Sequence, residues 1–308
     1  MKKINFIICL IFFLFYSFYA HSNIKIKYKI ENQIITNIDI LEEKRYITFL
    51  RPNLKNISKD EISKIAENSL IREIIKKKEL DTVFRNLENK DITIQIKKSL
   101  IDYVNVKNEA ELVDLLKENK IDYDKIILKM KYERLWNQLI FSKFNPLVKI
   151  DKIKLSQQLK KKISSNKKYE YNLSELLFEI DKNEKLNKKY KEIFDYIKLN
   201  NFKLAVFKYS ISDSSKKGGE IGWIKETLLS DDLNSILLKM KVDEISKPLK
   251  YPNGYLVLKI NDKKEMKQTI NFNKELEELI RYERNRQLNQ FSLLYFKKLK
   301  QNTLIDEK

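Results

Sequence analysis

Apolar residues at helical spacing dominate the N-terminal half of the chain, after one short stretch of strict alternation. Apolar and polar residues alternate over 24–35, which predicts a β-strand. Thr36 or Asn37 then caps the helix that follows. Ser58 and Glu61 have the spacing of a capping box, which predicts the start of another helix. The apolar stripe of that helix consists of Ile62, Ala66, Leu70 and Ile74.

Helical periodicity continues beyond this point and returns near the C-terminus. It predicts helices at about 91–104, 108–118, 122–143, 151–164 and 273–300. Asn108 and Asp122 cap two of them. An isolated amphipathic helix cannot bury its own apolar stripe. We therefore expect the helix at 273–300 to pack against the N-terminal helices.

Between these helical parts, the chain mixes strand and helix patterns. The expected strands are 170–179, 217–224 and 254–261, and the expected helices are 183–199, 202–209 and 230–240. This order predicts a βαααβαβ-type module with helices on a small antiparallel sheet. The predicted fold is α+β: a discontinuous helical domain, residues 23–165 completed by 265–308, with the module inserted at 168–263.

Residues 1–22 have the composition of a secretory signal peptide. Lys2 and Lys3 precede an apolar stretch, and Ala20 and Ser22 are small residues at a plausible cleavage site. The alternative is an uncleaved anchor, although the stretch is shorter than the ~20 residues that span a bilayer. Cleavage predicts an exported protein with no stable membrane span.

The mature chain would lack the side chains that many catalytic sites use. Cys9 is the only cysteine and His21 the only histidine, and both lie in the predicted signal. Disulfides, thiol nucleophiles, His-metal sites and Ser-His-Asp triads are therefore excluded, and we expect no metal and no cofactor. The net charge of +19 is spread along the whole chain. Because no basic stripe or known motif gathers it, we expect no nucleic-acid partner.

The four glycines all lie between residues 218 and 254. Three of them fall in the segment Gly218-Gly-Glu-Ile-Gly222, which marks a tight loop beside a strand. The flanking segments 202–210 and 240–260 complete a recognisable order. Together these segments resemble a parvulin-type (PpiC-like) peptidyl-prolyl isomerase domain.

The resemblance extends to the whole mature chain. Signal, N-terminal strand, helical domain, module and returning helix resemble the SurA-type periplasmic chaperone family, as does the motif Asn32-x-Ile-Ile-Thr-x-x-Asp39. The best-known members carry two parvulin modules, whereas this chain has one. Exported foldases with one module on a lipid or membrane anchor are an alternative.

The family resemblance implies a function in the periplasm. Its members bind unfolded outer-membrane β-barrel precursors, whose unpaired strand edges and alternating aromatic residues aggregate in water. A groove between the helical domain and the returning helix would hold extended segments of such polypeptides.

The resemblance also assigns candidate site residues. The catalytic cluster of parvulin domains includes two histidines and a Cys or Asp. The histidine positions fall on Glu175 and Leu256, and the Cys/Asp position falls on Ser212. Glu175 is then either a solvent-exposed strand residue or a partly buried one that is paired or protonated, with Lys259 as one conceivable partner.

The remaining positions concern the pocket that receives proline. The apolar cup falls on Leu229 and Leu233, and a threonine position near the last strand falls on Tyr251. The expected substrate-binding residues are therefore Leu229, Leu233, Tyr251 and Leu256. The two leucines are apolar but smaller than the Met and Phe that the resemblance implies there, so the cup is only partly kept. Because the histidines are also lost, we expect isomerase activity to be weak or absent.

Three functions remain open at this point. The first is a chaperone that holds unfolded exported proteins without catalysis, and the second is an active parvulin-type isomerase. The third is binding of an anionic surface such as lipid or polysaccharide, suggested by the positive charge. Binding of the third kind would collapse with added salt.

Overall fold

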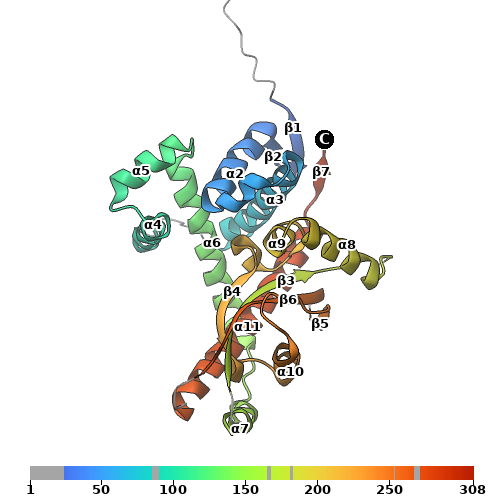
Figure 1. The fold of residues 1–308 in the computed structure, drawn as a ribbon. Coiled ribbons are helices and arrows are strands. Elements are labelled where there is room, and N and C mark those ends of the chain that lie inside the picture. Colours follow the sequence, from blue (N-terminus) through green and yellow to red (C-terminus); the bar gives the residue numbers. More distant parts are fainter. Residues whose placement is uncertain (1–23, 85–89, 165–167, 181–182, 253, 267–270) are drawn as a thin grey trace, which may run out of the picture.

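The computed structural model describes residues 24–84, 90–164, 168–180, 183–252, 254–266 and 271–308. The predicted signal peptide, residues 1–22, lies outside these ranges. Within them, no helix combines the length and the apolar character needed to cross a membrane. The described part of the chain has an α+β fold, in which helices surround a four-stranded sheet and a smaller three-stranded sheet (Figure 1).

The single strand predicted at 24–35 is instead a hairpin. Strands β1 (Ile26–Ile30) and β2 (Gln33–Thr36) pair antiparallel, and the chain reverses at Glu31, whose φ is +51°. The C-terminal strand β7 (Ile305–Glu307) pairs with the other edge of β1. The two ends of the described chain therefore lie side by side (Figure 1).

Five helices follow the hairpin and are called the helical body. They are α2 (Asn37–Leu50), α3 (Lys59–Val83), α4 (Lys90–Val104), α5 (Glu109–Glu118) and α6 (Tyr123–Phe144), with the 3-10 turn η1 (Pro52–Asn56) after α2. The predicted caps Thr36, Ser58, Asn108 and Asp122 each accept a backbone N–H from the residue three positions later. At Thr36, Asp39 completes a capping box. The predicted caps are confirmed. The capping box predicted at Ser58 is only half formed, because the Glu61 carboxylate accepts the Ser58 hydroxyl at 3.2 Å.

A second 3-10 turn, η2 (Asn145–Leu147), and helix α7 (Lys152–Ile163) lead from the helical body to residues 168–266, which we call the sheet module. Its elements are β3 (Tyr169–Phe178), α8 (Leu186–Leu199), α9 (Phe202–Tyr209), η3 (Asp213–Lys217), β4 (Glu220–Lys225), η4 (Glu226–Leu228), α10 (Asp231–Lys239), β5 (Leu249–Tyr251) and β6 (Gly254–Glu265). The strands form an antiparallel sheet in the order β4-β3-β6-β5.

The predicted βαααβαβ order needs two corrections. The third helical element before β4 is the 3-10 turn η3, and a short strand, β5, precedes the last strand. Alternate residues of β3 and β6 point to opposite faces of the sheet. Leu173 and Leu258 pack on the face that carries α10, while Leu176 and Val257 pack on the face that carries α8 and α9.

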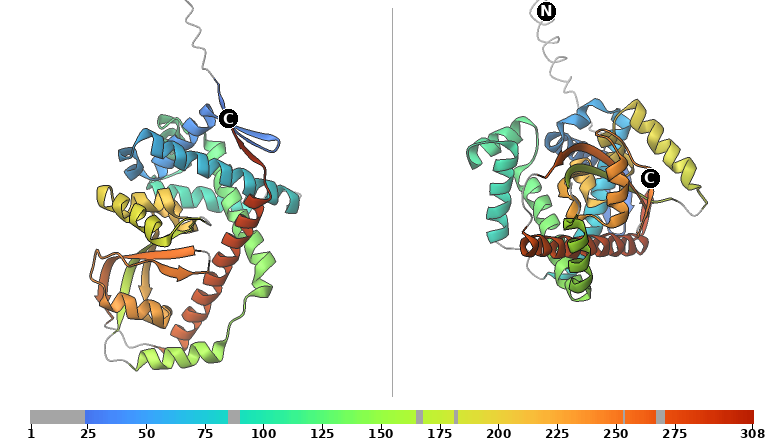
Figure 2. Two further views of the ribbon diagram at one scale, coloured as in Figure 1. Left: turned by 90° about the vertical axis from the view of Figure 1, so that its right-hand side faces the viewer. Right: turned by 60° about the horizontal axis from the view of Figure 1, so that its bottom comes forward.

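The long C-terminal helix α11 (Phe272–Gln301) runs past both the sheet module and the helical body (Figure 2). The buried indole N–H of Trp136, in α6, donates to the Ser292 hydroxyl at 2.9 Å. Near the start of α11, Glu275 pairs with Lys225 of β4 at 2.9 Å. The predicted packing of this helix on the N-terminal helices is therefore observed. The division of the chain into domains stays a prediction.

Two glycines are required by close backbone contacts. Gly219 has a φ of +82°, and a Cβ there would lie 2.3 Å from the carbonyl oxygen of Glu175. Gly254 has a φ of +141°, and a Cβ there would lie 2.2 Å from the carbonyl oxygen of Phe178. Both glycines thus let a loop approach β3 more closely than any side chain allows.

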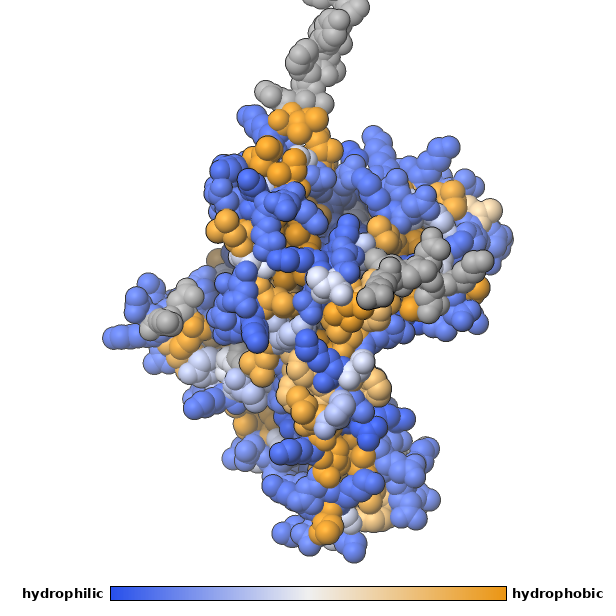
Figure 3. All heavy atoms as spheres, turned by 180° about the vertical axis from the view of Figure 1, so that it is seen from behind, coloured by the Kyte–Doolittle hydropathy of each residue, from blue (hydrophilic) through white to orange (hydrophobic). Residues whose placement is uncertain are grey.

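The surface is mostly charged, with apolar side chains between the charges. Figure 3 shows several such patches on the face seen from behind. Single exposed apolar residues are common on folded domains. The walls of cavities are therefore the more specific indication of a binding site.

Candidate functional site

A cavity of about 650 Å³ opens on the face of the sheet that carries α10. The sheet module supplies its apolar wall: Leu173, Leu229, Leu233, Leu249, Leu256 and Leu258. Helices α7 and α11 close it from the other side. All four predicted substrate-binding residues and Glu175 line this one cavity.

The apolar wall is built by two strands and the segment that leads into α10. Leu256 is 4% exposed and stands opposite Leu177 and Leu249 on the neighbouring strands. Leu229 is 3% exposed and follows the turn η4. Leu233 and Tyr251 are half-buried. The structure therefore gathers these side chains into a cup whose floor is buried and whose rim is accessible.

Glu175 is neither a fully exposed strand residue nor a partner of Lys259. One of its carboxylate oxygens accepts hydrogen bonds from Ser212 at 2.6 Å and from Ser214 at 2.8 Å. Lys259 pairs with Asp243 at 2.8 Å instead. Strand residues 175 and 259 lie on opposite faces of the sheet, because only residue 175 shares the face of the leucine cup.

Ser212 connects this carboxylate to the loop that ends at the glycines. It is 8% exposed and caps η3 by accepting the backbone N–H of Ser214 at 3.3 Å. The backbone N–H of Glu175 donates to the Gly219 carbonyl at 2.8 Å. The predicted pair Ser212 and Glu175 therefore forms one hydrogen-bonded unit at the edge of the cavity.

Several lining residues come from α11 and were not predicted. Tyr282 is held protonated because burial, followed by the nearby Tyr251 and Glu175, raises its pKa to about 12. Arg286 donates to Glu283 at 2.8 and 2.7 Å, and this hydrogen bonding raises the pKa of the guanidinium. Tyr282 and Arg286 are four residues apart and so share one face of the helix.

Helix α7 contributes a second unpredicted contact. The Lys162 ammonium group donates to the carbonyl oxygen of Leu229 and lies 3.5 Å from Asp231. Lys162 therefore fastens α7 to the segment that carries the cup. Periodicity predicted the helices that bear Lys162, Tyr282 and Arg286, but nothing in it indicated that they face the sheet module.

The chemistry open to this site follows from its donors and acceptors. The cup offers apolar surface of a size that suits a proline ring or a branched side chain, and its rim offers hydroxyl and guanidinium donors to a peptide backbone. Among the described residues, no group of three or more His, Cys, Asp or Glu side chains is placed to hold a metal ion.

Comparison with known proteins agrees with the architecture of the sheet module. Residues 172–262 match the family model of the rotamase, PPIC-type PPIase domain. The chaperone SurA of Pseudomonas putida is 40% identical over 55 residues, which cover 18% of this chain and 13% of the relative. The foldase protein PrsA 3 of Bacillus anthracis is 27% identical over 217 residues, which cover 69% of this chain and 71% of the relative.

The chain is similar to SurA chaperones and PrsA foldases, and its residues 172–262 form a parvulin-type (PPIC-type) domain. A solved SurA-like chaperone of Campylobacter jejuni aligns with 92% of this chain and with 98% of its own residues. The sequence identity is 17% and the TM-score is 0.38. The matched segment spans only a small part of the Pseudomonas putida SurA chaperone. The comparisons therefore leave the activity, clients and location of this chain to be proposed.

Proposed function

We propose that this chain is a periplasmic chaperone that binds unfolded exported proteins, in particular outer-membrane β-barrel precursors. Its parvulin domain serves mainly as a binding unit, with weak or no isomerase activity. The observation that carries the proposal is the composition of the 650 Å³ cavity. Leucines line the cup, whereas both positions that correspond to parvulin histidines hold other side chains.

The polar part of the site argues against efficient isomerisation. Twisting a prolyl amide has a barrier of ~18–20 kcal/mol because resonance is lost. Leu256 presents only a buried apolar side chain at the position of one histidine. Glu175 occupies the other, and the hydroxyls of Ser212 and Ser214 already bind to its carboxylate. Neither position offers an imidazole to the twisting amide.

The same cavity supports binding of extended polypeptide. Its floor is apolar, and α11 supplies Tyr282 and Arg286 opposite it. A segment lying between the cup and α11 would bury an apolar side chain in the leucines and direct its backbone toward the donors of the rim. Recognition of this kind tolerates many sequences, as a chaperone requires.

Binding is tested with a substitution at the rim of the cup. Leu233 is half-buried in α10 and lines the cavity, so Leu233→Ser should weaken binding of an unfolded barrel protein while the fold persists. Leu238 lies in the same helix, is 44% exposed and does not line the cavity. Leu238→Ser is therefore the matched control.

The measurement is suppression of aggregation of a urea-unfolded outer-membrane barrel protein, together with its affinity by fluorescence anisotropy. Full burial of one leucine contributes about 1.5–3 kcal/mol, and Leu233 is half-buried. We therefore expect Leu233→Ser to weaken affinity by about fivefold or more and Leu238→Ser to leave it unchanged. Equal affinity of both variants and the native chain would place client binding elsewhere.

The alternative function is an active parvulin-type isomerase that assists folding of exported proteins. The hydrogen-bonded pair Ser212 and Glu175 favours it, because Glu175 lines the cavity at a position of the parvulin polar cluster and Ser212 donates to its carboxylate. This alternative would be supported if the chain isomerises a prolyl peptide and Ser212→Ala abolishes the activity.

A further inference from the structure

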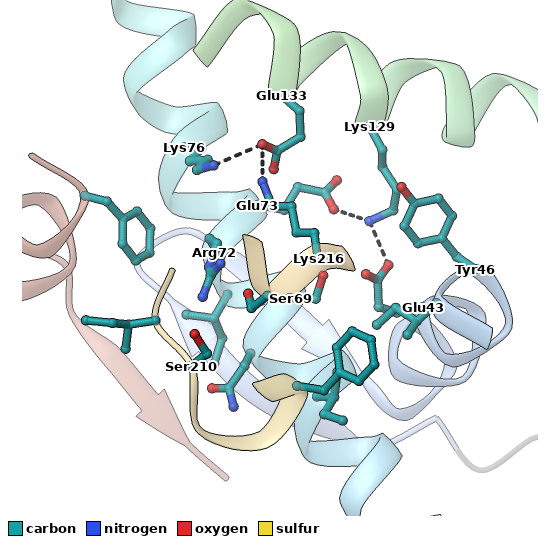
Figure 4. A pocket seen from close by; sticks show the side chains of 18 of the residues that line it. Glu43, Tyr46, Ser69, Arg72, Glu73, Lys76, Lys129, Glu133, Ser210 and Lys216 are labelled. Carbon is teal, nitrogen blue, oxygen red and sulfur yellow. Dashed lines mark hydrogen bonds and ion pairs between the residues drawn. The ribbon is translucent and has the colours of Figure 1, made fainter. Parts of the chain in front are cut away.

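A second cavity, of about 280 Å³, lies between the helical body and the sheet module. Its walls come from α2, α3 and α6 on one side and from α9 and η3 on the other, and α11 adds Phe296 and Lys300. Figure 4 shows its charged side chains, which converge from these separate elements. This cavity shares no lining residue with the leucine cup.

Most of the carboxylates at this cavity are already bound by lysines. The Lys129 ammonium group pairs with Glu73 and, at 2.7 Å, with Glu43. Glu133 pairs with Lys216 at 2.5 Å and with Lys76 at 3.1 Å (Figure 4). The acidic groups are therefore committed to partners within the wall.

Two arginines at the same cavity lack such partners. Within the described ranges, neither Arg51 nor Arg72 has a carboxylate oxygen within 4.0 Å or a side-chain hydrogen bond. Each guanidinium instead lies over an aromatic ring: Arg51 over Phe207 at 5.2 Å and Arg72 over Phe296 at 5.7 Å. Aromatic contact fixes the plane of a guanidinium and leaves its N–H donors at the edge free.

Neutral donors accompany these arginines. Ser69 and Ser210 both line the cavity, and both are labelled in Figure 4. The Ser210 hydroxyl oxygen accepts backbone N–H groups from Leu177 at 3.2 Å and Ser212 at 3.3 Å, so its own proton is available for donation. Arginine forks and hydroxyls are the donors that bind carboxylates and phosphates in proteins.

Two cations of the wall have lowered pKa values, mainly because they are buried. Burial, followed by the charge of Lys216, lowers the pKa of Lys76 to about 8, and Arg72 adds to the lowering. Burial also lowers the pKa of Arg51. An anion bound between these cations would relieve both effects.

We infer that the cavity between the helical body and the sheet module is an oxyanion-binding site, in which Arg51 and Arg72 bind a carboxylate or a phosphate group. Its volume suits one such group with a few atoms of the molecule that carries it. The carboxylate source would be the C-terminus of a polypeptide, and the phosphate source a free anion. This inference does not depend on the proposed chaperone function.

The test is isothermal titration calorimetry on the full chain with three probes. They are inorganic phosphate, N-acetylalanine as a terminal carboxylate, and N-acetylalanine amide as its neutral analogue. We expect the phosphate, the carboxylate or both to bind at concentrations up to about 10 mM, and the amide not to bind. Phosphate binding alone identifies a free anion as the ligand, and carboxylate binding alone identifies a chain terminus.

Substitutions of the two arginines test whether the anion binds in the cavity. Arg72→Gln and Arg51→Gln should each lower the affinity about tenfold, since each removes a charge-assisted hydrogen bond. Arg72→Lys keeps the positive charge but loses the forked donors, so its affinity should lie between those of the native chain and Arg72→Gln. It also replaces Arg72→Gln in the test if that variant does not fold. Arg284 is exposed and lies outside the cavity, so Arg284→Gln is the control and should bind as the native chain does.

Three results would overturn the inference. The first is that neither phosphate nor N-acetylalanine binds in this range. The second is that the neutral amide binds as well as the acid while phosphate does not bind. The third is that both arginine variants bind as tightly as Arg284→Gln, because the anion would then be attracted by the general lysine surface.

Discussion

Replacing Lys76 by methionine should stabilise the chain at neutral pH. The Lys76 side chain is 4% exposed, and burial, followed by repulsion from Lys216, lowers its pKa from 10.5 to about 8. Keeping this group protonated at pH 7 therefore costs about 3 kcal/mol relative to the unfolded chain. The ion pair with Glu133 at 3.1 Å is already part of that balance.

Methionine has a similar shape and carries no charge. Replacement of buried ionic groups by apolar ones of similar volume is often neutral or stabilising. Lys76 also lies 5.0 Å from the centre of the Trp136 ring, and this cation–π contact would be lost. We therefore expect Lys76→Met to raise the free energy of unfolding by about 1–3 kcal/mol.

The pH dependence of folding stability provides a second, independent test of the buried Lys76 charge. Between the folded pKa of about 8 and the ordinary value of 10.5, the unfolded chain binds a proton at Lys76 that the folded chain has released. Through this group, stability rises as pH increases across that window. Lys76→Met removes this rise, so its advantage over the native chain should shrink from pH 7 to pH 10.

Urea denaturation followed by tryptophan fluorescence at pH 7, 8.5 and 10 measures both effects. Lys78 lies in the same helix and is 52% exposed, so Lys78→Met is the control and should change stability by less than about 0.5 kcal/mol. If Lys76→Met destabilised the chain by 1 kcal/mol or more and kept the native pH dependence, the reasoning about buried charge would be refuted.

Three further predictions concern stability and are measured by urea denaturation followed by circular dichroism, because one variant removes the buried tryptophan. Glu133→Gln should lower the free energy of unfolding by about 1–2 kcal/mol, because Lys76 loses its nearest partner. The loss stays below the roughly 3–5 kcal/mol of a fully buried pair, because the Glu133 carboxylate is half-exposed. Trp136→Phe should cost about 1–3 kcal/mol, since it removes the hydrogen bond to Ser292 on α11. Gly219→Ala should cost about 2 kcal/mol or more, because the new Cβ would lie 2.3 Å from a carbonyl oxygen of β3.

Each of these has a result that contradicts it. Unchanged stability in Glu133→Gln would show that water already screens the ionic cluster. Unchanged stability in Trp136→Phe would mean that the buried indole does not contribute to the packing of α11. A Gly219→Ala variant as stable as the native chain would show that the loop relaxes without loss.

The helical body was predictable because its signals are local. Ser58, Asn108 and Asp122 cap helices through contacts three residues away. Spacing correctly placed Ile62 and Ala66 of α3 in the core, whereas Leu70 and Ile74 are only partly buried. The hairpin was missed because the chain reverses at Glu31, a residue that seldom adopts a positive φ. The alternation stops at Ile30 and three polar residues follow, but they include neither the Gly nor the Pro that most strongly marks a turn.

The candidate site was predictable only within the sheet module. Resemblance to parvulin domains located Glu175, Ser212 and the leucine cup, and the structure brings them together. Tyr282 and Arg286 lie outside the module, and their approach depends on how α11 packs. The second cavity is still harder to predict, because its walls come from segments far apart in the sequence that only tertiary folding brings together.

The central claim is that the parvulin domain binds polypeptide but has lost efficient catalysis. The most direct test measures cis–trans isomerisation of a short prolyl peptide by the full chain, at concentrations that suppress aggregation of an unfolded barrel protein. The account predicts a rate at or near the uncatalysed one, unchanged by Ser212→Ala, while aggregation is suppressed. Rapid turnover that Ser212→Ala abolishes would contradict it.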